Sequence, residues 1–323
     1  MKSQAENSVI SVRGLQKSYG ELPAIRGLDL EVQSGLMYGL IGPDGAGKTT
    51  LLRILCGLIL PDGGEVRVMG FDPVGEQDRI KDLIGYMPQR FSLYPDLTVA
   101  ENMRFFADIY NVPKAEREQT TRRLFQFSRL GPFADRKAGA LSGGMKQKLA
   151  LSCTLIHTPK LLILDEPTTG VDPVSRGEFW DILSELRREG VTILVTTPYM
   201  DEASLCHRIT LMFQGRALVQ GRPEHVTADF PHNIIRIYTD EVQSAGEALK
   251  RESGFGSVHL FGDRIHVAVS DVSTSLERIK KALENAQIAF SSIEEAKPDM
   301  EDVFVNLTAS LEEETRPSKL NNL

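Results

Sequence analysis

The sequence is poor in the features that mark several large classes of protein. Its three cysteines, Cys56, Cys153 and Cys206, stand far apart, without the paired spacing of a disulfide framework or a zinc site. We therefore expect three buried, reduced thiols. The longest apolar run, "LLRILCGLIL" at 51–60, is too short to span a bilayer and contains Arg53. Direct insertion into a membrane is therefore not expected.

A strong charge imbalance is also missing. The net charge is −7, with 41% hydrophobic and 25% charged residues, which is ordinary for a globular protein. This balance gives no basic surface for nucleic acid. The opening "MKSQAENSVI" lacks the apolar core of a signal peptide. We therefore expect a cytoplasmic protein that binds no nucleic acid and needs a partner for any membrane role.

The chain divides by pattern into two parts. From residue 8 to about 222, continuous apolar runs such as "MYGLIG" and "LLILDEP" alternate with helical periodicity. This alternation predicts an α/β fold with a largely parallel sheet. After the turn-rich "GRPEHVTADFPHN", the order β-α-β-β-α-β predicts a small ferredoxin-like α+β domain. We expect a first domain over 1–228, an accessory or regulatory domain over 229–310, and a disordered polar tail over 311–323.

A glycine-rich loop carries the most specific chemistry. "GPDGAGKTT" follows the strand "MYGLI", precedes a helix, and fits the phosphate-binding pattern G-x-x-x-x-G-K-[ST]. Its glycines let backbone N–H groups point inward, Lys48 can reach the β- and γ-phosphates, and the Thr49 hydroxyl can bind Mg²⁺. The predicted ATP-binding residues of this loop are Gly42, Pro43, Asp44, Gly45, Ala46, Gly47, Lys48, Thr49 and Thr50.

A second strand supplies acidic side chains. "LLILDEP" places Asp165 and Glu166 at the carboxyl end of an apolar run. Asp165 can hold Mg²⁺, directly or through water, and Glu166 can activate water as a general base. An acidic pair after a strand is weak evidence alone, but together with the glycine-rich loop it strongly predicts a phosphate-binding NTPase site, of a kind that many NTPases share.

The next motif narrows the class, because "LSGGMKQK" at 141–148 resembles the signature motif of ABC ATPases. Other landmarks agree in order. Tyr19 resembles the aromatic residue that stacks on adenine, Gln89 the glutamine of the Q-loop, and Asp172 the aspartate of the D-loop. The resemblance covers residues 8 to about 225. It implies a P-loop NTPase cassette with a parallel-rich central sheet, an antiparallel β subdomain and a helical subdomain.

The resemblance also implies roles for these residues. Gln89 would join Thr49 and Asp165 at Mg²⁺ and would take part in catalysis with Glu166. Read without the family, Tyr19 could be a surface aromatic and Gln89 a solvated loop residue. In the family the signature residues meet the γ-phosphate of ATP held by a second cassette in a head-to-tail dimer. Here they are Leu141, Ser142, Gly143, Gly144 and Met145.

Membrane partners follow from the same resemblance. In the family, the segment after Gln89 touches an integral membrane permease, so Phe91, Leu93 and Tyr94 would form a docking surface, or else half-buried packing. "KPDMEDVFVNLT" is similar to the ending of cassettes from exporters of drugs, lipids and polysaccharides with separately encoded permeases. This implies an ATPase subunit on the inner face of the plasma membrane.

One position departs from the family pattern. In "TTPYMDEA", Pro198 stands where the family has a switch histidine near the γ-phosphate. Proline offers no side-chain donor or acceptor, although its fixed φ suits the backbone. We expect the fold to survive and hydrolysis at this chain's own site to slow by about 10²- to 10⁴-fold. Thr196, Thr197 or Tyr199 could compensate in part.

Several functions remain open from the sequence. We favour a heterodimer in which an intact partner cassette is completed by this chain's signature motif. A homodimer with slow or still adequate hydrolysis, and a clamp that binds ATP without hydrolysis, are alternatives; Glu166 argues against the clamp. A regulatory ATP-binding module, or a soluble ABC protein of translation or DNA repair, is less consistent with one cassette and no coiled coil.

Overall fold

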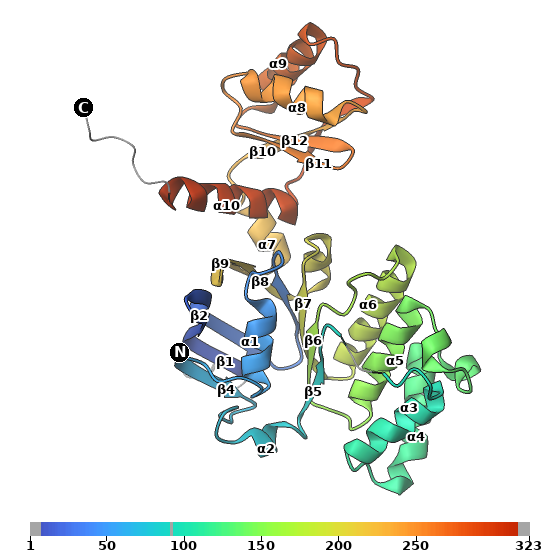
Figure 1. Cartoon of the computed structure of the whole chain (residues 1–323). Helices are drawn as coiled ribbons and strands as arrows, with labels where there is room; N and C mark the ends of the chain where they lie inside the picture. Colours follow the sequence, from blue (N-terminus) through green and yellow to red (C-terminus); the bar gives the residue numbers. More distant parts are fainter. Residues whose placement is uncertain (1–7, 91–92, 316–323) are drawn as a thin grey trace. The chain divides into compact units, whose positions relative to one another are not determined.

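The computed structural model describes residues 8–90 and 93–315, which divide into two compact units at Arg222 and Pro223 (Figure 1). The boundary expected after residue 228 falls too late, because α7 (Pro223–Ala228) packs against α10 (Met300–Thr315). The tail expected to be disordered from residue 311 is helical as far as 315, and 316–323 lie outside the described residues.

The first unit contains nine strands and six α-helices among the described residues. The strands are β1 (Ser8–Tyr19), β2 (Leu22–Gln33), β3 (Met37–Ile41), β4 (Gly63–Val68), β5 (Ile84–Met87), β6 (Leu161–Asp165), β7 (Thr192–Thr197), β8 (Arg208–Phe213) and β9 (Arg216–Gly221). The helices are α1 (Lys48–Leu55), α2 (Gln77–Ile80), α3 (Val99–Ile109), α4 (Lys114–Ser128), α5 (Gly143–Leu155) and α6 (Pro173–Arg188). Short 3₁₀ helices span Gly131–Phe133, Ala138–Ala140 and Asp201–Leu205.

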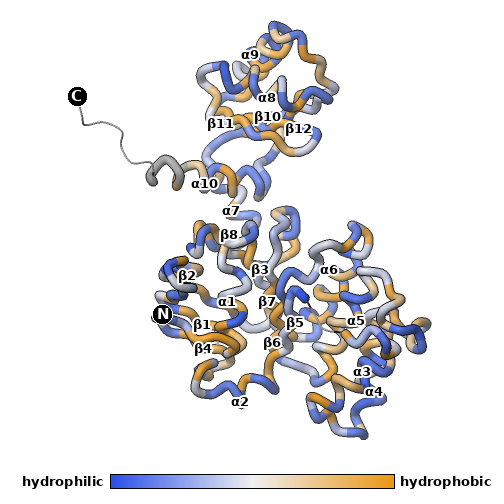
Figure 2. The backbone as a smooth tube through the Cα atoms, in the orientation of Figure 1, coloured by the Kyte–Doolittle hydropathy of each residue, from blue (hydrophilic) through white to orange (hydrophobic). Residues whose placement is uncertain are grey.

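The central sheet has the order β5-β6-β7-β3-β8-β9, and only β9 runs antiparallel to its neighbour. Every residue of β3, β6 and β7 is buried, as expected for parallel strands covered on both faces. These strands are strongly hydrophobic in Figure 2. Because they are parallel, the loops that follow Ile41, Asp165 and Thr197 meet at one edge of the sheet. The mostly parallel sheet predicted from the sequence is confirmed.

Two further layers complete the first unit. An antiparallel sheet with the order β2-β1-β4 shares one hydrophobic core with α1 and the strands β3, β6 and β7. The second layer is helical, and in it α5 packs against α3, α4 and α6. The antiparallel β and helical subdomains that the resemblance implied are therefore both present. All three cysteines are buried free thiols, as predicted, and burial raises the pKa of each.

The second unit is a four-stranded antiparallel sheet with the order β11-β12-β10-β13. Helices α8 and α9 pack against it through an apolar core that includes Ile237, Val267 and Leu283. Strand order and helix order are those of a ferredoxin-like domain, which confirms the prediction. Its remaining elements are β10 (Asn233–Tyr238), α8 (Val242–Arg251), β11 (Ser257–Phe261), β12 (Arg264–Val269), α9 (Val272–Asn285) and β13 (Ser292–Ala296).

The core of the second unit gives a stability prediction. Leu283 of α9 is fully buried, so Leu283→Ala should lower the free energy of unfolding of this unit by about 2–5 kcal/mol. Urea titration of the full chain, followed by hydrogen exchange of peptides from α9 and β10, measures the change. The exposed neighbour Glu284 provides the control, because Glu284→Ala should change stability by less than about 0.5 kcal/mol. Equal effects of the two variants would contradict this packing.

Candidate functional site

The loop between β3 and α1 is shaped by its glycines. Gly47 has φ 100°, and a Cβ atom there would lie 2.5 Å from the Ala24 carbonyl oxygen, so no other residue fits without strain. The Gly47 carbonyl accepts a hydrogen bond from the Leu51 amide at 3.0 Å, which starts α1. The N-terminal end of this helix therefore faces the space that the loop encloses, the arrangement that suits a bound phosphate.

Lys48 is almost completely buried within this loop, with 3% of its surface exposed. Its Nζ donates to the Gly42 carbonyl at 2.6 Å and the Pro43 carbonyl at 3.0 Å. The same Nζ lies 3.1 Å from Glu166 Oε1, and that carboxylate is also buried. A buried ammonium needs such partners because desolvation penalises the charge. An anionic phosphate can take the place of the glutamate.

Glu166 joins two of the predicted site residues. Its Oε2 accepts a hydrogen bond from Gln89 Nε2 at 2.9 Å, so the loops after β5 and β6 meet at this carboxylate. Its backbone N–H donates to Thr196 Oγ1 at 2.9 Å. Glu166 has φ 49°, a left-handed conformation that is uncommon outside glycine and is concentrated at functional sites. The structure thus brings Lys48, Gln89 and Glu166 together.

Thr49 and Asp165 form an adjacent pair of oxygen ligands. Thr49 Oγ1 donates to Asp165 Oδ1 at 3.0 Å, and Thr196 Oγ1 donates to the same oxygen at 3.0 Å. Burial raises the pKa of Asp165 above its ordinary value, although the hydrogen bonds from Thr196 and Thr49 oppose that shift. A hydroxyl beside a carboxylate is the kind of hard oxygen set that Mg²⁺ prefers. The residues present therefore fit Mg²⁺, whose charge would offset the cost of burying Asp165.

A cleft of about 810 Å³ opens over these groups. Predicted residues on its wall are Tyr19, Asp44, Gly45, Ala46, Gly47, Lys48, Thr49, Thr50, Gln89 and Glu166. The wall also contains residues that the sequence did not single out, namely Leu22, Pro23, Ala24, Arg26 and Gln214. They come from β2 and from the β8–β9 turn, which carry no motif. Pro198 is not among the lining residues.

The signature and D-loop residues lie away from this cleft. Ser142 caps α5 by accepting a hydrogen bond from the Met145 amide at 3.3 Å, and Asp172 caps α6 through the Ser175 amide at 2.9 Å. Ser142 and Gly143 are exposed, whereas Gly144 is buried against α6. None of the five residues Leu141–Met145 lines the chain's own cleft.

Pro198 follows directly after β7 and is half-buried. Among its neighbours, Thr196 contacts the site directly, through Asp165 and the Glu166 amide. The Tyr199 ring is instead covered by the Arg176 guanidinium at 4.1 Å, and Thr197 Oγ1 bonds to Glu202. Of the three residues considered as substitutes for the histidine, only Thr196 touches the acidic pair.

Comparisons with known proteins match both units. Residues 25–169 fit the family described as "ABC transporter", and residues 221–308 fit the family described as "ATP-binding protein DrrA1-3-like, C-terminal domain". The Nod factor export ATP-binding protein I of Ralstonia nicotianae is 35% identical over 93% of this chain and 94% of its own length. This chain belongs to the ABC transporter ATP-binding proteins. It is an ABC transporter ATPase, as the resemblance implied.

Two further matches extend the comparison of this ABC ATPase. The probable multidrug ABC transporter ATP-binding protein YbhF of Escherichia coli is 50% identical over 68% of the chain, which spans 39% of that relative's length. A dimeric post-hydrolysis state of the cassette MJ0796, bound to ADP and Pi, has a TM-score of 0.60 and 27% identity. That match covers 66% of this chain and 98% of the other. No helix in the described ranges has the length and apolar character to cross a bilayer.

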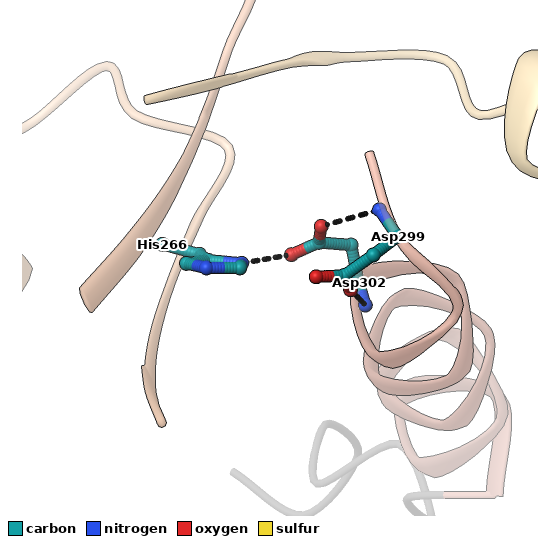
Figure 3. A group of neighbouring side chains, drawn as sticks. All are labelled: His266, Asp299 and Asp302. Atoms are coloured by element: carbon teal, nitrogen blue, oxygen red, sulfur yellow. Dashed lines mark hydrogen bonds and ion pairs between the residues drawn. The ribbon is translucent and has the colours of Figure 1, made fainter. Parts of the chain in front are cut away.

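The ABC ATPase has a second group of titratable side chains, in the DrrA-like unit. His266 Nδ1 lies 2.7 Å from Asp302 Oδ1, and Asp299 is close by. Figure 3 shows the three side chains together. Although burial alone would raise it, hydrogen bonds from His266 and the Asp299 amide hold the pKa of Asp302 below its ordinary value. Arg236 donates to His266 Nε2 and to Asp299 Oδ2, each at 3.1 Å. The guanidinium thus already supplies the positive charge that a metal would bring, and the group anchors α10 to β10 and β12.

The two signature glycines give a matched prediction. A Cβ at Gly144 would lie 2.5 Å from Ser175 Cβ, whereas nothing lies within 4 Å of one at Gly143. Gly144→Ala should therefore lower the free energy of unfolding by about 1–3 kcal/mol through overpacking. Gly143→Ala should leave it unchanged or raise it by less than about 1 kcal/mol. Thermal unfolding of the two variants beside wild type tests this, and equal midpoints would contradict the α5–α6 contact.

Proposed function

We propose that the cleft binds MgATP and that the chain powers a membrane exporter by hydrolysing it. The observation that carries this proposal is the convergence of the buried Lys48 and the exposed Gln89 on the buried carboxylate of Glu166, at the wall of the cleft. A module that only binds ATP would need a counter-ion for Lys48, but it would not need that carboxylate to be held by Gln89 as a general base for water. The exposed Tyr19 at the cleft wall would stack on adenine.

The proposed chemistry begins with an exchange of partners. When ATP enters, its β- and γ-phosphates take over the Lys48 ammonium from Glu166, and the glutamate becomes free to accept a proton. Gln89 positions the attacking water, Glu166 removes its proton, and the γ-phosphoryl group passes to that water while ADP leaves. Mg²⁺ held by Thr49, Gln89 and Asp165 would neutralise developing charge on the phosphate oxygens.

The names of similar proteins support an export role. The relatives carry the printed names "Nod factor export" and "Probable multidrug ABC transporter" ATP-binding proteins. We infer a similar exporter role here, at the inner face of the plasma membrane and with a separate permease as partner. Tyr94, which is 44% exposed after the Q-loop, and the half-buried Leu93 would contribute to permease docking. Phe91 lies outside the described residues.

The second partner is another cassette. MJ0796 is dimeric in its solved post-hydrolysis state, and the exposed Ser142 and Gly143 suit contact with ATP across such a dimer. Because Pro198 cannot act as the switch residue, we propose a heterodimer whose partner keeps an intact hydrolytic site. A homodimer that relies on Thr196 and hydrolyses ATP adequately is the alternative, supported by its contacts with Asp165 and Glu166. A cassette that binds ATP with little hydrolysis is the other.

The proposed base gives the first functional prediction. Glu166→Gln should lower kcat at least about 100-fold, because an amide cannot accept the proton from water. ATP affinity should be kept or increased, since Lys48 loses a competing anion. Phosphate release and nucleotide titration of the purified chain measure the two effects. The exposed Glu185 on α6 is the control, because Glu185→Gln should change neither. Hydrolysis by Glu166→Gln at the wild-type rate would refute the assignment.

The switch position, Pro198, gives the second functional prediction. Pro198→His should raise steady-state hydrolysis at least about tenfold, because an imidazole would be restored beside the γ-phosphate. The gain should disappear in the double variant Pro198→His with Glu166→Gln. Nucleotide affinity and thermal midpoint serve as controls for the fold.

The opposite result is equally informative. If wild type already turns over ATP at an ordinary transporter rate, and Pro198→His changes nothing, the impaired-site proposal fails. Thr196→Val then becomes the variant that should abolish hydrolysis. If wild type is slow and the histidine restores activity, a second cassette should be sought by co-purification with the permease.

A further inference from the structure

Glu202 is a buried carboxylate outside the cleft that gathers hydrogen bonds from three segments of the cassette. It lies in the 3₁₀ helix Asp201–Leu205 and is only 2% exposed. Its Oε1 accepts from Thr168 Oγ1 at 2.9 Å and from Trp180 Nε1 at 2.9 Å. Its Oε2 accepts from Thr197 Oγ1. The carboxylate thus has a donor from the loop after β6, from α6 and from the end of β7.

The charge of Glu202 is balanced locally. Arg176 of α6 donates from Nε to Glu202 Oε1 at 3.1 Å and brings Nη2 to 3.0 Å of the same oxygen. Thr168, Thr197 and Trp180 are themselves buried. In such surroundings a carboxylate is stable only while its donors stay in place, and each donor loses its partner if the carboxylate moves. The four contacts therefore tend to hold or change together.

The two threonines that bond to Glu202, Thr168 and Thr197, lie in the two segments on either side of the acidic pair. Thr168 follows Glu166 in the loop that leads to Asp172, the D-loop residue that caps α6. Thr197 directly precedes Pro198 and follows Thr196, which bonds both Asp165 and the Glu166 amide. Glu202 therefore links the D-loop side of the catalytic carboxylate to the switch side. Pro198 has no side-chain donor or acceptor with which to make that link.

We propose that Glu202 is a positioning residue that couples the loop of Thr168 to the switch segment at Thr197. A displacement of either segment changes the hydrogen bonds that Glu202 offers the other, so the two segments respond as one. The consequence for hydrolysis rests on the proposed function of the cleft. The structural coupling itself does not.

The test uses the full chain and three single variants, Thr168→Val, Thr197→Val and Glu202→Gln. Thr154→Val is the matched control, because Thr154 is equally buried and donates to the Ala150 carbonyl at 2.9 Å within α5. Hydrogen exchange with ATP present reports on peptides 166–173 and 195–201. Thermal midpoint, ATP affinity and kcat are measured on the same samples.

Coupling predicts reciprocal effects. Thr168→Val should raise exchange in peptide 195–201 as well as its own, Thr197→Val should raise exchange in 166–173, and Glu202→Gln should raise both. Each should lower kcat about tenfold or more by displacing the catalytic carboxylate, with ATP affinity unchanged because Glu202 does not line the cleft. Thr154→Val should lower the thermal midpoint without raising exchange in the two peptides and without lowering kcat.

Two results would overturn the proposal. Exchange that rises only in the segment carrying the substitution would show that Glu202 transmits nothing. A kcat equal to that of Thr154→Val, at a similar loss of thermal midpoint, would reduce Glu202 to a structural role. If the chain hydrolyses no ATP above the level of Glu166→Gln even when it carries Pro198→His, the proposed function fails instead, and the exchange data still decide the coupling.

Discussion

The burial of opposite charges at the carboxyl ends of β3 and β6 is the constraint on which the rest of the cassette depends. Lys48 and Glu166 lie 3.1 Å apart with almost no exposed surface, and neither charge could stay buried alone. Parallel strands bring the two loops to one edge of the sheet, and the positive φ of Glu166 turns its side chain toward the lysine. The pair is complete without ligand. In the proposed mechanism, ATP competes with this internal carboxylate, and Glu166 becomes free to act as the base when phosphate takes over Lys48.

Pro198 fits the backbone conformation at the end of β7 but offers no polar side chain to the site. The residue ends β7 without breaking the ladder, since Thr197 still pairs with Ile41, and an extended residue before proline is the favoured conformation. In the proposed function, the consequence is the loss of a side chain that could contact phosphate. The Thr196 hydroxyl, two residues before Pro198, is already engaged by the Asp165 carboxylate and the Glu166 amide. A hydroxyl committed to two carboxylate residues orients them and has little freedom to follow a departing phosphate.

Much of the fold and cleft could be predicted because the information was local. The apolar runs of β3 and β6, the glycine-rich loop and the acidic pair each sit within a few consecutive residues. The features that the sequence did not predict depend instead on contacts between segments that are far apart in the chain. Arg26 and Gln214 meet at the cleft wall, where the Arg26 amide donates to the Gly215 carbonyl at 2.9 Å, a contact between distant segments. The boundary at Pro223 depends on α7 packing with α10, and no turn-rich composition could report that contact. Glu202 was missed for the same reason, since its donors come from three separate segments.

Each unit has a buried or half-buried group in which a cation contacts a carboxylate. The two groups differ in the cation, which is Lys48 in the first unit and Arg236 in the second. Lys48 offers three hydrogens on a flexible stem at the wall of a large cleft, so it can give up a carboxylate for a phosphate. Arg236 presents a rigid fork whose Nε and Nη2 are both engaged, by His266 and Asp299. Asp299 in turn accepts hydrogen bonds from the Glu301 and Asp302 amides at the start of α10, and His266 bonds to Asp302. Any ligand would have to displace the guanidinium and loosen the helix in one step. A buried ion group with a mobile cation can serve as a site, whereas one closed around an arginine serves as an anchor.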